Sequence, residues 1–175
     1  MTASILCPGP SLARLTESHL YVDLVVAVNR AATRWPCTVW ACGDTPLFEQ
    51  IQHQVIGSPT WMVSQSQLDV IHDHIKAGIC QPWRGKIQTI QPMLQFLPHA
   101  INWVSFTFTH ALTYSAWVGC DEINVYGCDW EPNAPDFDGI QGGKNRSFDR
   151  FRAEKGIFQA ICELLPKVKV SRIAL

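Results

Sequence analysis

Short apolar runs alternate with longer, mixed stretches along the chain, and the runs have the length of buried strands. We expect strands at residues 3–7, 23–29, 38–42, 60–63, 122–127 and 168–170. Most of these runs lack a polar residue at every second position, and several end at or just before Gly, Pro, Asn or Asp. Apolar residues on both sides of a strand are typical of a parallel sheet that is covered on both faces.

The stretches between the runs predict helices at residues 12–20, 46–54, 107–118 and 147–165. Strands that alternate with helices indicate an α/β fold with a mostly parallel sheet and helices on both faces. The sequence shows no internal repeat or low-complexity linker, so we predict a single domain over residues 1–175. Residues 64–100, with repeated Gln, Trp, Pro and His, fit helical pieces and irregular loops, and we interpret this segment as a lid or insertion.

Composition disfavours several classes of function. The chain has 175 residues, of which 47 % are hydrophobic and 17 % charged, with 14 Lys and Arg against 15 Asp and Glu. This near-neutral balance disfavours binding to nucleic acid or to an anionic membrane surface. No apolar run approaches the roughly 20 residues of a membrane span, and the first apolar run lacks the positive residues of a secretion signal. We therefore expect a cytoplasmic protein. The low share of charged residues and the seven tryptophans are also compatible with an apolar surface patch through which the chain forms a homo-oligomer.

The seven cysteines have irregular spacing and no C-x-x-C motif. Several lie within apolar runs, such as Cys7 and Cys162, where a reduced cysteine behaves as a small apolar residue. A zinc site would need clustered Cys and His, which the six histidines do not supply. We therefore predict buried free thiols in a reducing compartment rather than disulfides or a metal site.

Small or polar residues stand at the ends of four expected strands. They are Gly9, Pro10 and Ser11, then Asn29, Asp44 and Asp129. In an open parallel sheet the carboxyl ends of the strands meet at one rim, where ligands bind. The turn at 9–11 predicts close backbone approach and free N–H groups for a phosphate. The alternative is a tight turn in which Ser11 only caps a helix.

The other strand-end residues each allow two interpretations. Asn29 could hydrogen-bond a base or ribose, or cap the helix that follows, and Asp44 has the same alternatives. Asp129 could orient a ribose or substrate hydroxyl, or tie down the long loop after it. His110 is the histidine best placed to act as a general base near neutral pH.

The loop that follows Asp129 carries a second set of candidates. Asp136 and Asp138 form a D-x-D pattern, whose carboxylates suit Mg²⁺ or Mn²⁺ on a nucleotide diphosphate. The alternative is a pair of solvated acids in a loop. Lys144 and Arg146 could neutralise a phosphate or a sugar carboxylate, or lie on the solvated face of the last helix.

Three segments of the sequence resemble a known family. They are residues 5–12 (ILCPGPSL), 26–29 (VAVN) and 118–130 (VGCDEINVYGCDW). The pattern is similar to that of bacterial sialyltransferases that use CMP-sialic acid. It is also similar to a wider group of bacterial and phage Rossmann-like proteins, which includes motility-associated glycosyltransferase-like proteins and a pterin pyrophosphokinase branch.

This resemblance implies a Rossmann-like nucleotide-binding domain. The turn at 9–11 and Asn29 would hold the nucleotide, Thr107 would lie near a nucleotide-binding turn, and Asp129 would contact the ribose or the transferred group. The chain departs from the family at its catalytic residues. The family's catalytic His follows the third segment, whereas this chain has no His after His110 and no Tyr after Tyr126.

Our leading hypothesis is a glycosyltransferase-like enzyme that transfers a sugar from a nucleotide-activated donor to an unknown acceptor. In this hypothesis Asp129, or one of Asp136 and Asp138, serves as the catalytic base or as a metal ligand for the acceptor hydroxyl. Two alternatives stay open at this stage. One is a non-catalytic nucleotide-binding protein of a phage or regulatory kind. The other is a metal-dependent, pyrophosphokinase-like phosphotransferase, which would use Asp136 and Asp138.

Overall fold

Seven parallel strands form one sheet in the computed structural model, which describes residues 1–98, 104, 106–132, 134–140 and 147–175. The strands are β1 (Thr2–Leu6), β2 (Leu24–Val28), β3 (Val39–Ala41), β4 (Thr60–Val63), β5 (Ile87–Thr89), β6 (Glu122–Tyr126) and β7 (Lys169–Ile173). Their order is β5-β4-β3-β2-β1-β6-β7, and every neighbouring pair is parallel. The predicted α/β fold with a parallel sheet is therefore confirmed.

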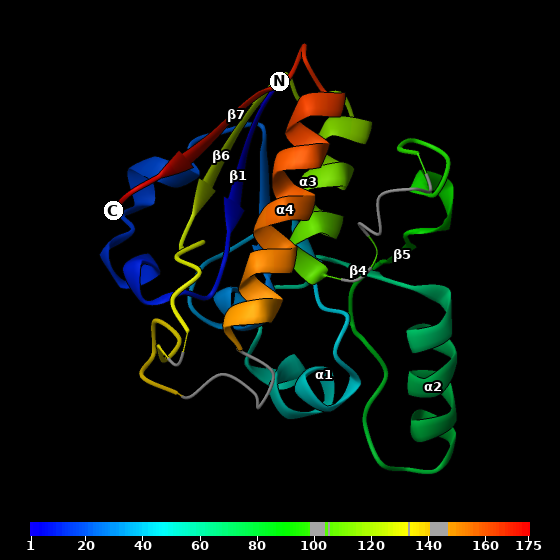
Figure 1. Cartoon of the computed structure of the whole chain (residues 1–175). Coiled ribbons are helices and arrows are strands. Elements are labelled where there is room, and N and C mark those ends of the chain that lie inside the picture. Colours follow the sequence, from blue (N-terminus) through cyan, green and yellow to red (C-terminus); the bar gives the residue numbers. More distant parts are fainter. Residues whose placement is uncertain (99–103, 105, 133, 141–146) are drawn as a thin grey trace.

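Helices cover both faces of this sheet. The α-helices are α1 (Thr45–Ile51), α2 (Gln65–Lys76), α3 (Thr107–Trp117) and α4 (Phe148–Leu164). Short 3₁₀ helices are η1 (Pro10–Arg14), η2 (Glu17–Leu20), η3 (Asn29–Thr33), η4 (Gln52–Gln54) and η5 (Gln91–Met93). Helices α3 and α4 lie together against one face, where α3 contacts the central strands (Figure 1).

Alternate residues of each strand point to two separate apolar cores. Ile5 and Val26 belong to the core that includes residues of α3 and α4, whereas Leu6 and Ala27 belong to the core on the other face. The second core also contains residues of η1, η3, α1 and α2. This arrangement explains why β1 to β4 read as continuous apolar runs, since these strands are buried almost throughout on both faces of the sheet.

Residues 12–20 do not form the single helix that their pattern predicted. The structure has η1 and η2 there, and the backbone is extended between them at Leu15 and Thr16. Thr16 and His19 explain the break, because the His19 ring lies 3.2 Å from the Thr16 amide and 2.9 Å from its hydroxyl. This local hydrogen bonding starts a new turn instead of continuing the first.

The segment 64–100 contributes more to the sheet than the sequence predicted. Ser64 caps α2 by accepting a hydrogen bond from the Gln67 amide, and Leu68 and Ile71 of this polar helix are buried. Residues 87–89 form β5, which pairs with β4. These parts belong to the sheet and its helical cover, whereas a lid role for the rest of the segment stays a prediction. None of the helices in the described ranges combines the length and apolar character that a membrane span needs.

All seven cysteines are free thiols, as the sequence predicted, and five of them are buried. Burial raises the pKa of Cys37 and of Cys42 from 9.0 to about 12. A thiol with a raised pKa holds its proton more tightly in the folded state than in the unfolded state. Its contribution to stability is therefore complete below pH 9 and is lost as the pH rises through the folded pKa.

We expect the free energy of unfolding to fall between pH 9 and pH 12. Each such thiol should contribute a slope of about 1.4 kcal/mol per pH unit in this window. Urea unfolding of the wild type and of Cys42→Ala at a series of pH values measures the slope. The variant should show a shallower dependence, and equal slopes would contradict burial of the Cys42 thiol.

Candidate functional site

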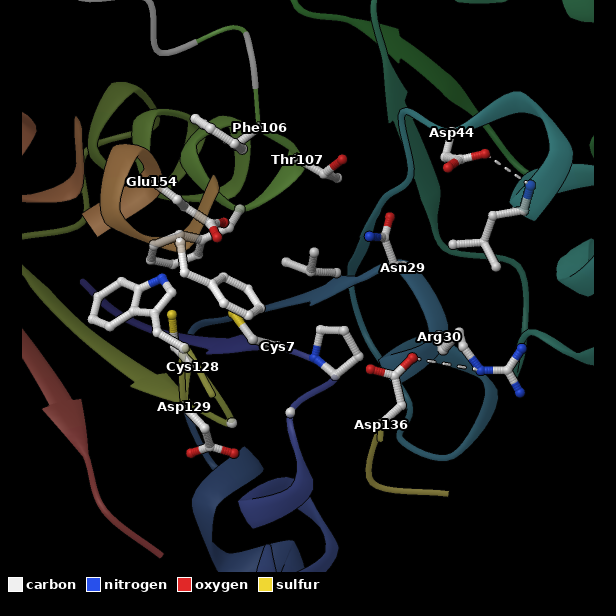
Figure 2. Close-up of a pocket in the computed structure, with 18 of the residues that line it drawn as sticks. Cys7, Asn29, Arg30, Asp44, Phe106, Thr107, Cys128, Asp129, Asp136 and Glu154 are labelled. Carbon is white, nitrogen blue, oxygen red and sulfur yellow. Dashed lines mark hydrogen bonds and ion pairs between the residues drawn. The ribbon is translucent and has the colours of Figure 1, made fainter. Parts of the chain in front are cut away.

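A cavity of about 940 Å³ lies at the carboxyl ends of β1, β2, β3 and β6 (Figure 2). The chain runs from β1 outward to β5 and then returns to the other side of β1 as β6, so the direction of strand order reverses there. Such a reversal is the usual ligand-binding position in open α/β sheets. The cavity lining includes Gly9, Pro10, Asn29, Asp44, Thr107 and Asp129. The structure therefore brings most of the predicted strand-end residues together.

Asp129 holds the turn that follows β1. Its Oδ2 accepts a hydrogen bond from the Ser11 amide at 2.8 Å, and its Oδ1 accepts one from the Ser11 hydroxyl at 2.6 Å. Ser11 itself is not among the described residues that line the cavity, and its hydroxyl does not cap η1. The Asp129 carboxylate, which follows β6, thus holds the turn after β1 in place.

The turn at 9–11 does not present the free N–H groups that we expected for a phosphate. The Gly9 amide donates to the Gly127 carbonyl at 2.9 Å, Pro10 has no amide hydrogen, and the Ser11 amide donates to Asp129. Glycine is needed at position 9 for packing, because a Cβ there would overlap the Gly127 carbonyl oxygen and lie 2.6 Å from Asp129 Oδ2. Gly9 and Pro10 therefore contribute surface to the cavity, while their role toward a nucleotide stays a prediction.

Asn29 has an amide oxygen without a hydrogen-bond partner. Among the described residues, its Oδ1 is buried and accepts no hydrogen bond. The residue has a φ of 52°, in the left-handed region that Asn tolerates better than most residues, and its backbone carbonyl accepts from Trp40 Nε1 at 2.9 Å. Its side chain does not cap η3. An unsatisfied buried acceptor costs about 1–3 kcal/mol, which a ligand donor would recover.

Asp44 and Thr107 reach the cavity from two other elements. Asp44 caps α1, because its Oδ1 accepts a hydrogen bond from the Leu47 amide at 3.1 Å. It lines the cavity as well, so its two proposed roles are compatible in this structure. Thr107 is the first residue of α3 and lies near Asn29 in the close-up (Figure 2).

The two acids of the D-x-D pattern face an arginine. Asp138 Oδ2 accepts hydrogen bonds from Arg30 Nε at 3.0 Å and from Nη2 at 2.6 Å, and Asp136 Oδ2 lies 3.9 Å from Arg30 Nε. Arg30 and Asp136 are buried, at 8 % and 4 % exposure, whereas Asp138 lies at the exposed edge of this group. No group of three or more metal-ligating side chains occurs in the described part of the chain. In this arrangement the acids do not fit a metal ion, because a cation held by both would have to displace the guanidinium.

His110 does not reach the cavity, contrary to the expectation that it acts as a base there. It is 5 % exposed in α3, and its Nε2 lies 2.9 Å from the Val104 carbonyl oxygen. Burial lowers its pKa, although the backbone hydrogen bond opposes this effect. It is absent from the described residues of the cavity lining. Lys144 and Arg146 lie outside the described residues.

The sequence interpretation missed the wall that α4 supplies. Arg150, Phe151 and Glu154 of this helix line the cavity, and the Arg150 guanidinium lies 5.1 Å from the centroid of the Phe106 ring. Their spacing by three and four positions places them on one face of the helix. This i, i+3 and i, i+4 spacing was the signal in the sequence that could have placed the three residues together.

Comparison with known proteins identifies a fold. No family model matches the chain, and no curated protein matches it. The crystal structure of the sialyltransferase CST-II, in complex with a trisaccharide acceptor and CMP, is similar with a TM-score of 0.62 and 15 % sequence identity. The similarity covers 99 % of this chain and 81 % of that chain. The chain therefore has the α/β fold of a sialyltransferase, in agreement with the resemblance seen in its sequence.

Proposed function

We propose that this chain is a glycosyltransferase-like enzyme that binds a CMP-activated sugar and transfers the sugar to a hydroxyl acceptor. The observation that carries the proposal is the unpaired Asn29 amide oxygen in a large cavity at the reversal of strand order. CMP is the nucleotide in the complex of similar fold. A cavity of about 940 Å³ is also large enough for a nucleotide sugar.

The strand order suggests how the donor lies. Asn29 follows β2 and Asp44 follows β3, so these two polar side chains would bind the nucleoside. The sugar would then extend past β1 toward β6 and α4. Asp129, at the end of β6, would keep the turn after β1 in place beneath the donor.

A nucleotide-binding protein without transferase activity is the second candidate. It is favoured by the position of His110, which leaves the described cavity lining without a histidine. A metal-dependent phosphotransferase is less well supported. Asp136 and Asp138 would have to bind the metal, and Arg30 occupies them.

A nucleotide panel tests the proposal directly. CMP, CDP, UDP, GDP and ADP are added separately, with and without Mn²⁺, and the melting temperature is recorded. CMP at about 100 times its Kd should add roughly 2.7 kcal/mol, or about 5–10 °C for a chain of this size. We expect the shift to be independent of Mn²⁺, because Arg30 neutralises the two acids. The absence of a shift with every nucleotide would refute the proposal.

Asn29→Gly should weaken CMP binding about tenfold, the loss of roughly one hydrogen bond. Glycine adopts a positive φ without strain, so the fold should tolerate this change. Calorimetric titration gives the affinity, and urea unfolding of the same variant gives its stability. Unchanged affinity in a stable variant would show that the Asn29 amide does not contact the nucleotide.

A further inference from the structure

A few buried polar atoms of the described side chains have no hydrogen-bond partner. They are Asn29 Oδ1, Trp35 Nε1, Thr113 Oγ1 and Trp130 Nε1. Asn29 and Trp130 belong to the cavity lining, whereas Trp35 and Thr113 are absent from its described part. Buried polar atoms are nearly always hydrogen-bonded, so two exceptions in one cavity wall require an explanation. Asn29 offers an acceptor and Trp130 offers a donor, which together suit a ligand with polar groups at both ends.

Trp130 lies on the opposite side of β1 from Asn29. Asn29 follows β2 and Trp130 comes after β6, and these two strands flank β1 in the sheet. Figure 2 shows Asn29 and Asp129, the neighbour of Trp130 in the chain, on opposite sides of Cys7. The unsatisfied donor is therefore at the end of the cavity that faces β6, away from the proposed nucleoside site.

Trp130 also has a strained backbone. Its φ is 50°, in the left-handed region where a bulky side chain is unusual. It comes directly after Asp129, whose carboxylate binds Ser11, so the strained turn is fixed to the turn after β1. Residues in such conformations are concentrated at binding and active sites. The strain and the missing hydrogen bond thus occur in the same residue of the cavity wall.

The surroundings of the indole ring indicate what its N–H can bind. The ring centroid lies 6.3 Å from that of Phe108 and 5.4 Å from that of Phe158, and the Arg172 guanidinium lies 5.3 Å from it. An indole N–H is a donor only, so its partner must be an acceptor. The positive charge of Arg172 beside the ring favours an electron-rich acceptor such as a sugar oxygen.

We propose that the indole N–H of Trp130 donates a hydrogen bond to an oxygen of the donor sugar, so that Trp130 selects among donors. This assignment rests on the proposed function, in which the sugar extends past β1 toward β6 and α4. Nε1 is buried, so the ring turns slightly toward the cavity as the bond forms. A donor that lacks an oxygen at this position leaves the N–H unsatisfied and binds more weakly.

The test compares Trp130→Phe with Trp35→Phe as a matched control. Each tryptophan is half-buried and has a buried Nε1 without a partner, and an arginine guanidinium lies over each ring, at 5.3 Å for Trp130 and 5.7 Å for Trp35. Calorimetric titration gives the Kd of each variant for CMP and for CMP-sialic acid. We expect Trp130→Phe to bind CMP-sialic acid about tenfold more weakly, with the Kd for CMP changed by less than about threefold. Trp35→Phe should bind both as the wild type does.

A nuclear magnetic resonance measurement separates a lost hydrogen bond from altered packing. Each of the seven tryptophans gives one indole N–H signal, and the two variants assign those of Trp130 and Trp35. CMP-sialic acid should move the Trp130 signal downfield, because the N–H gains an oxygen acceptor. The Trp35 signal should stay in place, and CMP alone should leave the Trp130 signal nearly unchanged.

Several results would overturn the assignment. Trp130→Phe could bind CMP-sialic acid as the wild type does, or lose affinity for CMP and CMP-sialic acid equally. No indole signal of the wild type could move downfield with CMP-sialic acid, a result that does not require the variant to fold. A wild type that binds CMP-sialic acid no more tightly than CMP would also exclude the sugar contact while leaving the nucleotide site intact. If the wild type does not bind CMP at all, the proposed function itself fails, and calorimetry alone shows this.

Discussion

Replacing Gly127 with alanine is expected to lower the free energy of unfolding by about 3 kcal/mol. Gly127 has a φ of 67°, where an alanine costs roughly 1–2 kcal/mol. A Cβ there would also overlap the Cys7 carbonyl oxygen and lie 2.9 Å from Leu12 Cβ, and such overpacking adds about 1–3 kcal/mol. Urea unfolding gives the energy, and the melting temperature should fall by about 6–12 °C.

Gly57→Ala is the control for this substitution. Gly57 has a φ of 73°, but a Cβ there would meet no atom within 4 Å. Its alanine variant should therefore show the backbone cost alone, about 1 kcal/mol. The difference between the two variants measures how tightly the turns after β1 and β6 pack. Equal losses in both variants would mean that the two turns can separate at no cost.

Asp129→Ala should weaken both the fold and nucleotide binding. The change removes two hydrogen bonds to a half-buried carboxylate, each worth about 1.5 kcal/mol or more. We expect a loss of about 3 kcal/mol in stability, and a loss of about 10–100-fold in CMP affinity because the turn after β1 is released. Urea unfolding and calorimetric titration measure the two effects.

The same variant decides between two roles for Asp129. A positioning residue should lower CMP affinity while the turnover of the bound donor changes little. A catalytic residue, as the sequence suggested, should lower turnover at saturating CMP-sialic acid. Ser11→Ala is the companion variant, since it removes the hydroxyl bond but keeps the amide bond. Ser11→Ala should lose about half as much stability as Asp129→Ala. An unchanged free energy of unfolding would mean that the bond between the Ser11 hydroxyl and Asp129 does not stabilise the turn.

The strongest strands were readable from the sequence because burial on both faces leaves a simple pattern. Residues 24–28 are buried at every position, and no polar residue interrupts them. Strand β5 left no such pattern, since Ile-Gln-Thr at the edge of the sheet is only partly buried. Helix α2 could not be predicted for the same reason, because only Leu68 and Ile71 of its twelve residues are buried and its apolar pattern is weak.

The candidate site was predictable where it depends on strand ends alone. Asn29 and Asp129 follow apolar runs, and a parallel sheet brings such positions to one rim. What Asp129 contacts depends on Ser11, which is 118 positions away. The guanidinium that faces the D-x-D acids comes from Arg30, which is 108 residues from Asp138. No local spacing could indicate that pair, so the sequence left a metal site and a pair of solvated acids as the two alternatives.

The position of β6 in the sheet has a consequence for the order in which the chain can fold. Strands β1 to β5 can pair in sequence order, but β1 receives its second neighbour only after residues 122–126 have been synthesised. Until then its free edge resembles an edge strand, open to pairing with other chains. The Ser11–Asp129 bonds, which span 118 residues, form at this late step. A nucleotide bound in the cavity would therefore stabilise the protein only after β6 has paired with β1, and it would slow the separation of these two strands.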